Sequence, residues 1–356
     1  MDNKSTSGVQ RWNSFDTVKG IACIAVTLIH YNFASKFTPE IVSTSVKAVC
    51  RIGVPIFFFI SGYFLSPNGQ YPEPKKTVKK IRHIIQVLFV SAVFYSIFDV
   101  FINIMRNDDW NRAEYVKSLF VPAKVIKLLI TNDPFVYSHL WFMMALIFVY
   151  IFVLIILNEK TFKAVYIAPV LLTAYTLMQE FEILPASIPI IGTDGKLCIF
   201  NLFIFRALPF VMFGVIAKRN EEKIAGWRLN TVSLICLIAI GAVMSVAEAQ
   251  LFNVSQFYIG NYVMVFALVV ICIKYPGLKI PFLYHIGKDL SMYIYILHIA
   301  VGKLYDLFAV QIFGVVPAVY YVKPVVILAV VILLSECVFR FKEFFCRRGL
   351  KKSRKA

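Results

Sequence analysis

Long apolar runs, separated by short polar stretches, recur along the whole of this 356-residue chain. A helix of about 20 apolar residues is long enough to cross a bilayer, because each helical residue adds about 1.5 Å. The pattern predicts about ten such helices, at residues 15–34, 47–66, 83–104, 139–157, 163–179, 199–217, 229–248, 257–273, 289–309 and 318–339. We therefore expect an all-α polytopic integral membrane protein.

The basic residues outside these runs predict how the chain is oriented. An even number of spans puts both ends on one side, and Lys and Arg collect in cytoplasmic loops. With both ends in the cytoplasm, most of the 37 Lys and Arg residues fall on that side, including those in KKTVKKIR at 75–82. We expect an N-in/C-in protein with a cytoplasmic tail at 1–14, a membrane domain at 15–340 and a basic cytoplasmic tail at 341–356.

Composition and charge agree with this class of protein. The chain is 59% hydrophobic and 16% charged, whereas soluble domains have about 45–50% apolar and about 25% charged residues. Basic cytoplasmic loops account for the net charge of +17, so we predict the lipid bilayer as a partner and no nucleic acid. The seven Cys residues show no metal-binding spacing, and we predict no metal site. The expected location is the cell (inner, cytoplasmic) membrane, with several spans.

The first apolar run, FDTVKGIACIAVTLIHYNF at 15–33, carries charged and titratable residues. Asp16, Lys19 and His30 share one face of the predicted helix, and about 16 Å of helix axis separates Lys19 from His30. Charged groups in contact with lipid are costly, so this face is expected to meet protein or a water-filled cavity. The alternative is that Asp16 and Lys19 lie at the membrane interface while His30 caps the other end.

The second run begins with Arg51, in RIGVPIFFFISGYFL. In the N-in arrangement His30 and Arg51 both approach the outer leaflet, where a guanidinium disfavours a second positive charge on the imidazole. A neutral imidazole is what a general base for a hydroxyl group requires. Lys19, at the inner end, can offer a cation to a phosphate-bearing ligand. Each of these cations has an alternative role as an anchor at the membrane interface.

Together with three later segments, these two stretches resemble the membrane-bound acyltransferase-3 family. The segments are HLWFMMAL at 139–146, FRALPFVMFG at 205–214 and GKDLSMYIYILHIAV at 287–301. The first helix of that family carries a basic residue, ten intervening residues and a histidine, which Lys19 and His30 match. One departure is that Lys19 stands where Arg is common, and Lys lacks the planar fork that binds phosphate through two hydrogen bonds.

The resemblance implies transfer of an acyl group, most often acetyl, from cytoplasmic acyl-CoA to a hydroxyl of an extracytoplasmic glycan or a lipid-linked sugar. On this basis we predict His30 and Arg51 as catalytic residues, and Lys19 with Asp16 as the residues that bind the acyl-CoA donor. The donor, acetyl-CoA or another acyl-CoA, is a substrate, so no permanently bound cofactor is expected. The rival hypothesis is a secondary transporter or a flippase of a lipid-linked sugar.

Three further residues are candidates for binding the acceptor. Arg206 lies near the outer side, where an interfacial anchor is an equally good interpretation. Trp141 can stack on a sugar, although Trp at a helix end is commonly an interfacial residue. His298 lies about mid-membrane, where a histidine is either satisfied within the core or functional.

Overall fold

The computed structural model describes residues 12–33, 37–65, 72–106, 117, 137–156, 161, 163–185, 187–189, 196–198 and 202–353. Within these ranges the protein is almost wholly helical, which confirms the predicted helical class. The departure is one short hairpin, in which β1 (Ser187–Pro189) pairs antiparallel with β2 (Lys196–Cys198). The segment between the third and fourth predicted apolar runs, residues 105–138, lies almost entirely outside the described residues.

Each predicted apolar run contains helix where it is described, although several run ends and two internal breaks are not helical. In chain order the helices are α1 (Asn13–His30), α2 (Glu40–Cys50), α3 (Gly53–Tyr63), α4 (Pro74–Arg106), η2 (Ser138–Leu140), α7 (Trp141–Ile156), α8 (Ala164–Glu180), α9 (Phe203–Arg206), α10 (Leu208–Arg219), α11 (Glu221–Ala225), α12 (Thr231–Leu251), α13 (Ile259–Lys274), α14 (Pro281–His285), η4 (Ile286–Leu290), α15 (Ser291–Phe313) and α16 (Pro317–Ser353). The segment KKTVKKIR is the start of α4, and α16 continues through most of the predicted basic tail.

Six helical segments of the described chain are long and apolar enough to cross a membrane. They are Glu40–Tyr63, Pro74–Arg106, Ser138–Ile156, Thr231–Leu251, Pro281–Phe313 and Pro317–Cys346. The shorter α13 is apolar but has 16 residues, and α8 has 17. At about 1.5 Å per residue such helices fall short of a hydrocarbon core of about 30 Å. The count of about ten spans and the N-in/C-in orientation therefore stay predictions.

Two of the predicted runs are each broken into two helices. Between α2 and α3 the break falls at Arg51 and Ile52, and between α9 and α10 it falls at Ala207. Pro55 and Pro209 follow these breaks by a few residues. Proline has no backbone N–H, so neither residue can bond to the carbonyl four positions earlier, and a continuous helix is interrupted there. The first break gives Arg51 a position between two helix ends.

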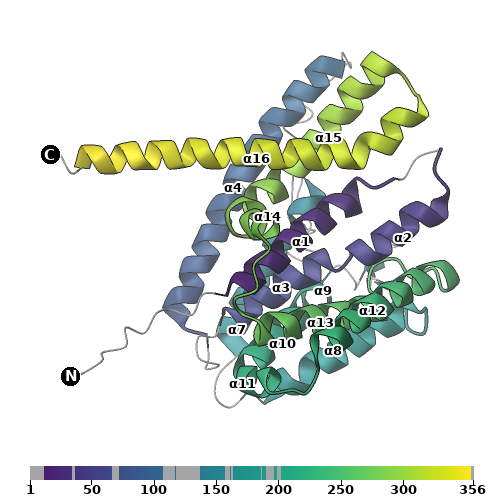
Figure 1. The fold of residues 1–356 in the computed structure, drawn as a ribbon, viewed down its shortest axis with the longest axis vertical. Helices are drawn as coiled ribbons and strands as arrows, with labels where there is room; N and C mark the ends of the chain where they lie inside the picture. The colour runs from purple at the N-terminus through teal and green to yellow at the C-terminus, as the bar shows by residue number, and fades with distance from the viewer. Residues whose placement is uncertain are drawn as a thin grey trace.

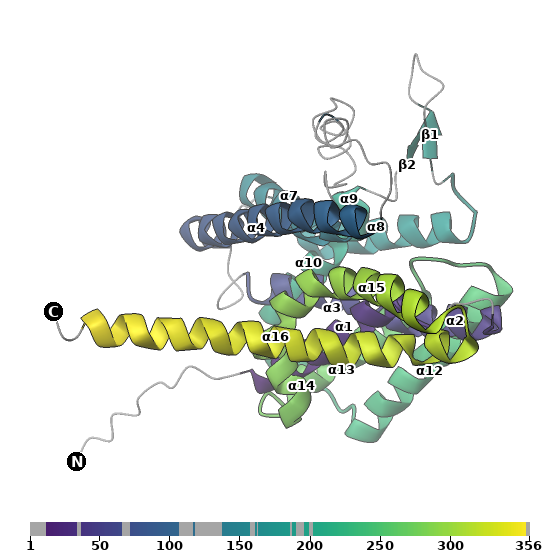
Figure 2. The same ribbon diagram turned by 90° about the horizontal axis from the view of Figure 1, so that it is seen from above.

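Helix α1 lies at the centre of the protein (Figures 1 and 2) and contacts α2, α3, α13, α14, η4, α15 and α16. Its approach to α14 and η4 is very close. A Cβ atom on Gly20 would lie 2.1 Å from the carbonyl oxygen of Leu283, and one on Gly287 would lie 1.8 Å from that of Asp16. The end of α1 that carries Lys19 is therefore fixed against α14 and η4 by backbone-to-backbone packing.

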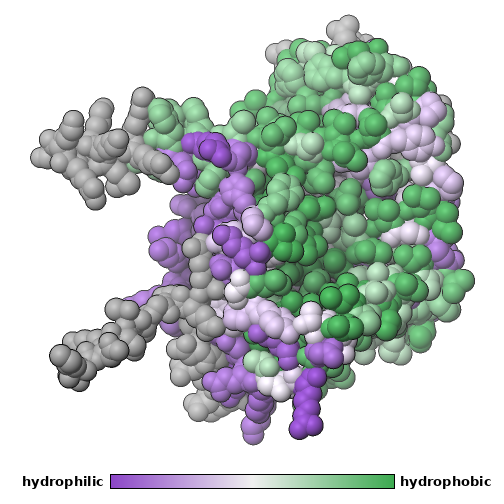
Figure 3. Space-filling model, in the orientation of Figure 1, coloured by the Kyte–Doolittle hydropathy of each residue, from purple (hydrophilic) through white to green (hydrophobic). Residues whose placement is uncertain are grey.

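The surface is divided into a broad apolar zone and a hydrophilic zone on one side. Figure 3 shows a broad hydrophobic zone with a hydrophilic zone on the left of the view, the side toward which α16 extends. The first residues of α1 and the last turns of α16 lie toward that same side (Figure 1). Lys19 lies near this side, and His30 lies at the opposite end of α1.

Candidate active site

Three histidines from separate elements form a cluster beyond the end of α1. The ring centroids of His30 and His298 are 5.1 Å apart, and those of His298 and His139 are 5.4 Å apart. His139, on η2, is 4% exposed and His298, on α15, is 1% exposed. His30 is an exposed residue. His30 is therefore the member of this cluster that a reactant can touch.

The end of α1 is held against α15 by the residue that follows His30. The hydroxyl of Tyr31 donates a hydrogen bond to the carbonyl oxygen of Ile299, at 3.0 Å. The ring of Tyr31 lies directly over Gly302, where an added Cβ atom would be 1.9 Å from a ring carbon. This contact sets the position of His30 relative to His298.

His30 lines a cavity of about 90 Å³, which we call the histidine cavity. Its other lining residues come from α1, α3, α7, the break before α3, α9 and the loop before α13; they are Val26, Ile29, Arg51, Val54, Pro55, Trp141, Arg206, Gln256 and Phe257. Four residues predicted for the site, His30, Arg51, Trp141 and Arg206, therefore surround one space. His298 does not line it and lies behind the ring of His30.

The cations of the histidine cavity are held in different ways. The guanidinium of Arg206 lies 4.5 Å from the ring centroid of Trp141 and donates a hydrogen bond to the side chain of Gln256. Stacking on an aromatic face fixes the plane of a guanidinium and leaves its edge for other partners. By contrast, the buried Nε of Arg51 has no hydrogen-bond partner among the described residues. Such a buried donor is costly unless a ligand or water accepts from it.

The loop that presents Gln256 is fixed by two carboxylates. Glu180, at the end of α8, accepts hydrogen bonds from the backbone N–H groups of Ser255, Gln256 and Phe257, at 3.1, 3.4 and 3.3 Å. Glu248 accepts from the N–H groups at the start of α13, at 2.7 and 3.0 Å. Glu180 therefore binds backbone donors beside the histidine cavity.

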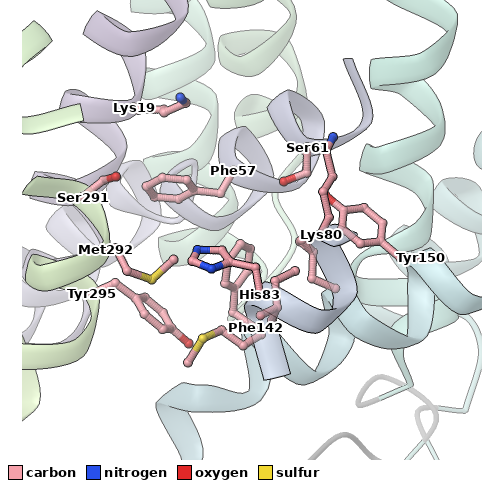
Figure 4. A pocket seen from close by; sticks show the side chains of 13 residues that line it. Lys19, Phe57, Ser61, Lys80, His83, Phe142, Tyr150, Ser291, Met292 and Tyr295 are labelled. Atoms are coloured by element: carbon pink, nitrogen blue, oxygen red, sulfur yellow. The ribbon is translucent and has the colours of Figure 1, made fainter. Parts of the chain in front are cut away.

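A second cavity, of about 280 Å³, opens near the start of α1, and we call it the lysine cavity. Figure 4 shows His83 in the middle of its lining residues, with Lys19 and Lys80 on different sides. Apart from these three its lining is mostly apolar; the other residues are Phe57, Ser61, Ile84, Phe142, Met143, Leu146, Tyr150, Ser291, Met292 and Tyr295. The cavity thus combines cationic groups with an apolar interior.

Lys19 and Asp16 form an ion pair within the first turns of α1. The Nζ of Lys19 lies 2.8 Å from Oδ1 of Asp16, and the two side chains are 26% and 19% exposed. Lys80 donates a hydrogen bond to the carbonyl oxygen of Phe64, at 2.8 Å. Lys19 and Asp16 are therefore neighbours, as their spacing requires. Lys19 lines the lysine cavity, and neither residue lines the histidine cavity.

A layer of aromatic side chains separates the two cavities. Phe57 and Phe142 line the lysine cavity, with ring centroids 5.9 Å apart. Val54, one turn earlier on α3, and Trp141, next to Phe142, line the histidine cavity. We call Phe57 and Phe142 the aromatic partition. The linings of the two cavities therefore meet at α3 and at the start of α7.

A family model described as an acyltransferase domain, Acyl_transf_3, matches residues 12–336. The chain belongs to the acyltransferase-3 family. A search of curated proteins and a search of solved structures each gave no match. The family match covers both cavities and the histidine cluster, and it identifies this protein as a membrane acyltransferase.

Several residues at this site escaped the sequence analysis. His139 stands in the HLWF segment beside Trp141, and this proximity was the available signal. Gln256 and Glu248 carried no local signal, because they meet Arg206 and the start of α13 only in the folded protein. Lys80 lies in KKTVKKIR, whose basic residues indicate only the orientation of the chain.

Proposed function

We propose that this acyltransferase-3 member is an O-acyltransferase, in the first instance an O-acetyltransferase, that transfers the acyl group of cytoplasmic acyl-CoA to a hydroxyl of an extracytoplasmic or lipid-linked glycan. The observation that carries the proposal is the position of His30. His30 is an exposed residue that lines one cavity, while a second, cation-lined cavity includes Lys19, nearer the other end of α1. The family match supports the acyl-transfer chemistry.

The lysine cavity suits the donor. Coenzyme A has a phosphorylated head and a long, narrow pantetheine arm, and Lys19 and Lys80 supply cations for phosphate oxygens. Phe57, Phe142 and Tyr295 offer apolar walls to the arm. Lys19 and His30 are eleven residues apart, which is about 16 Å along a helix axis. The thioester reaches His30 when the aromatic partition parts.

The histidine cavity suits the acceptor. Arg206 stacked on Trp141 presents guanidinium N–H groups and an aromatic edge, and Gln256 adds an amide. Sugars are bound by such combinations of aromatic surface and planar hydrogen-bonding groups. A hydroxyl placed here lies beside His30.

The chemical step follows from these positions. The neutral imidazole of His30 removes the proton of the acceptor hydroxyl as its oxygen attacks the thioester carbonyl carbon. The Arg51 Nε–H, which has no other described partner, donates to the carbonyl oxygen as negative charge develops on it. The carbon–sulfur bond then breaks, and the proton on His30 passes to the thiolate. The products are an O-acyl ester and free coenzyme A.

The test is acyl transfer by the purified protein in proteoliposomes. Radiolabelled acetyl-CoA is supplied with envelope glycans, and the glycans are analysed by mass spectrometry for addition of one acyl group. We expect transfer by the wild-type protein and none above background by His30→Ala, with unchanged thermal unfolding. Transfer by His30→Ala at the wild-type rate would overturn the role of His30. Failure of the wild-type protein to acylate any glycan would contradict the proposed function.

A further inference from the structure

His298 is a buried residue, and of its two ring nitrogens one is hydrogen-bonded to a described residue. Its Nδ1 lies 3.1 Å from the backbone carbonyl oxygen of Ile294, one helical turn earlier on α15. A carbonyl oxygen can only accept a hydrogen bond, so Nδ1 carries the proton. A second ring proton would place a charge in the interior, where no described carboxylate contacts the ring. In the neutral ring, Nε2 is left with a free lone pair.

This lone pair has no partner among the described residues. An acceptor kept from water without a partner costs about 1–3 kcal/mol. The ring is 1% exposed, so bulk water does not satisfy it. His298 bears this cost in the centre of the histidine cluster, which indicates that its lone pair has a function there.

Two rings lie beside His298. The ring of His139 is 5.4 Å away and nearly perpendicular to it, at 84°. The ring of His30 is closer, at 5.1 Å, and inclined by 45°. Of the two, His30 opens into a cavity, and it needs a fixed tautomer if one of its nitrogens is to act as a base.

We infer that His298 is a positioning residue for His30: its Nε2 accepts an N–H from the His30 ring, so that the other ring nitrogen of His30 faces the histidine cavity with its lone pair free. A modest rotation of the exposed His30 ring completes this hydrogen bond. The inference rests on the proposed function, since it assigns how the base of that reaction is oriented. It differs from the predicted contact of His298 with the acceptor.

The arrangement also stabilises the charged form of the base. When His30 accepts the hydroxyl proton, both of its nitrogens carry hydrogen, and one of the two N–H groups remains bonded to Nε2 of His298. The Nδ1–H of His298 stays on the Ile294 carbonyl throughout. No proton has to pass through His298, so its part is orientation alone.

Two amide substitutions separate this role from a structural one. The amide of Asn reaches the position of the histidine Nδ1, so His298→Asn can keep the hydrogen bond to the Ile294 carbonyl. It has no hydrogen-bond acceptor at the position of Nε2. The amide of Gln reaches the position of Nε2, so His298→Gln can accept from His30. We expect His298→Asn and His298→Ala to lower kcat by about 10–100-fold, the loss found when a partner that orients a metal-binding histidine is removed, with unchanged KM for donor and acceptor. His298→Gln should recover most of kcat.

The measurement is steady-state acyl transfer in proteoliposomes, with thermal unfolding of each variant. Equal activity of His298→Asn and His298→Gln, or higher activity of His298→Asn, would overturn the inference. A rise in acceptor KM with unchanged kcat would do the same and would favour contact with the acceptor. If the wild-type protein transfers no acyl group, the proposed function is wrong. If transfer occurs but substitution of His298 does not change it, only the inference about His298 is wrong.

Discussion

The hydroxyl end of the Tyr31 ring lies against Gly302, and its hydroxyl donates a hydrogen bond to the carbonyl oxygen of Ile299, one turn earlier on α15. Tyr31 follows His30 in the chain, and His298 precedes Ile299. One tyrosine therefore fixes the distance between the exposed histidine and the buried one behind it.

Gly302→Ala should disturb this distance. The added Cβ atom would lie 1.9 Å from the Tyr31 ring, so the ring and the end of α1 must move. Overpacking of this kind costs about 1–3 kcal/mol, and we expect a lower unfolding temperature and a fall in kcat of at least tenfold. The matched control is Gly277→Ala, where an added Cβ atom meets nothing within 4 Å. Wild-type kcat in Gly302→Ala would show that this contact does not position His30.

Lys19→Ala should weaken donor binding. One charge-assisted hydrogen bond to phosphate contributes about 1.5–3 kcal/mol, so the KM for acyl-CoA should rise by about tenfold or more while the acceptor KM stays unchanged. Lys76 provides the control, because it forms an ion pair with Glu73 at the same 2.8 Å and the same spacing but with a side chain that is 64% exposed. Lys76→Ala should leave the donor KM within twofold of the wild-type value. Equal increases in both KM values for Lys19→Ala would contradict the phosphate role.

Glu180→Ala should loosen the loop that carries Gln256. Three backbone N–H groups lose their acceptor, at a cost of about 1–3 kcal/mol for unsatisfied donors. We expect a lower unfolding temperature and a raised acceptor KM, and a smaller effect for Glu180→Gln, which keeps one acceptor oxygen. Glu182→Gln, at an exposed neighbour, is the control. An unchanged acceptor KM would show that the loop does not depend on this carboxylate.

The helices were predictable because a bilayer imposes their length and composition. The apolar runs at 139–157, 163–179 and 257–273 correspond closely to α7, α8 and α13. The breaks at Arg51 and Ala207 also have a local cause, since Pro55 and Pro209 stand just after them. The hairpin of β1 and β2 had no such signal, because its strands are three residues each and lie in a Pro- and Gly-rich loop.

The site was predictable only in part. Lys19 and His30 share a helix, so the helical period relates them. The grouping of His30 with Arg51, Trp141 and Arg206 depends on four separate segments, and the resemblance to a family supplied what spacing alone did not. The contact of His298 with His139, and the bonds of Glu180 to Ser255 and its neighbours, join residues that are far apart in the chain, so no local pattern could reveal them.

The aromatic partition has a consequence for the membrane itself. An enzyme whose two substrates come from opposite sides of a bilayer would, with a single open cavity, provide a path for ions and protons. Phe57 and Phe142 line the lysine cavity next to residues that line the histidine cavity. In the proposed reaction the barrier is therefore interrupted only when an acyl arm fills the gap between the rings. In the proposed reaction the acyl group is then all that crosses, and the electrochemical gradient of the cell is preserved during each turnover.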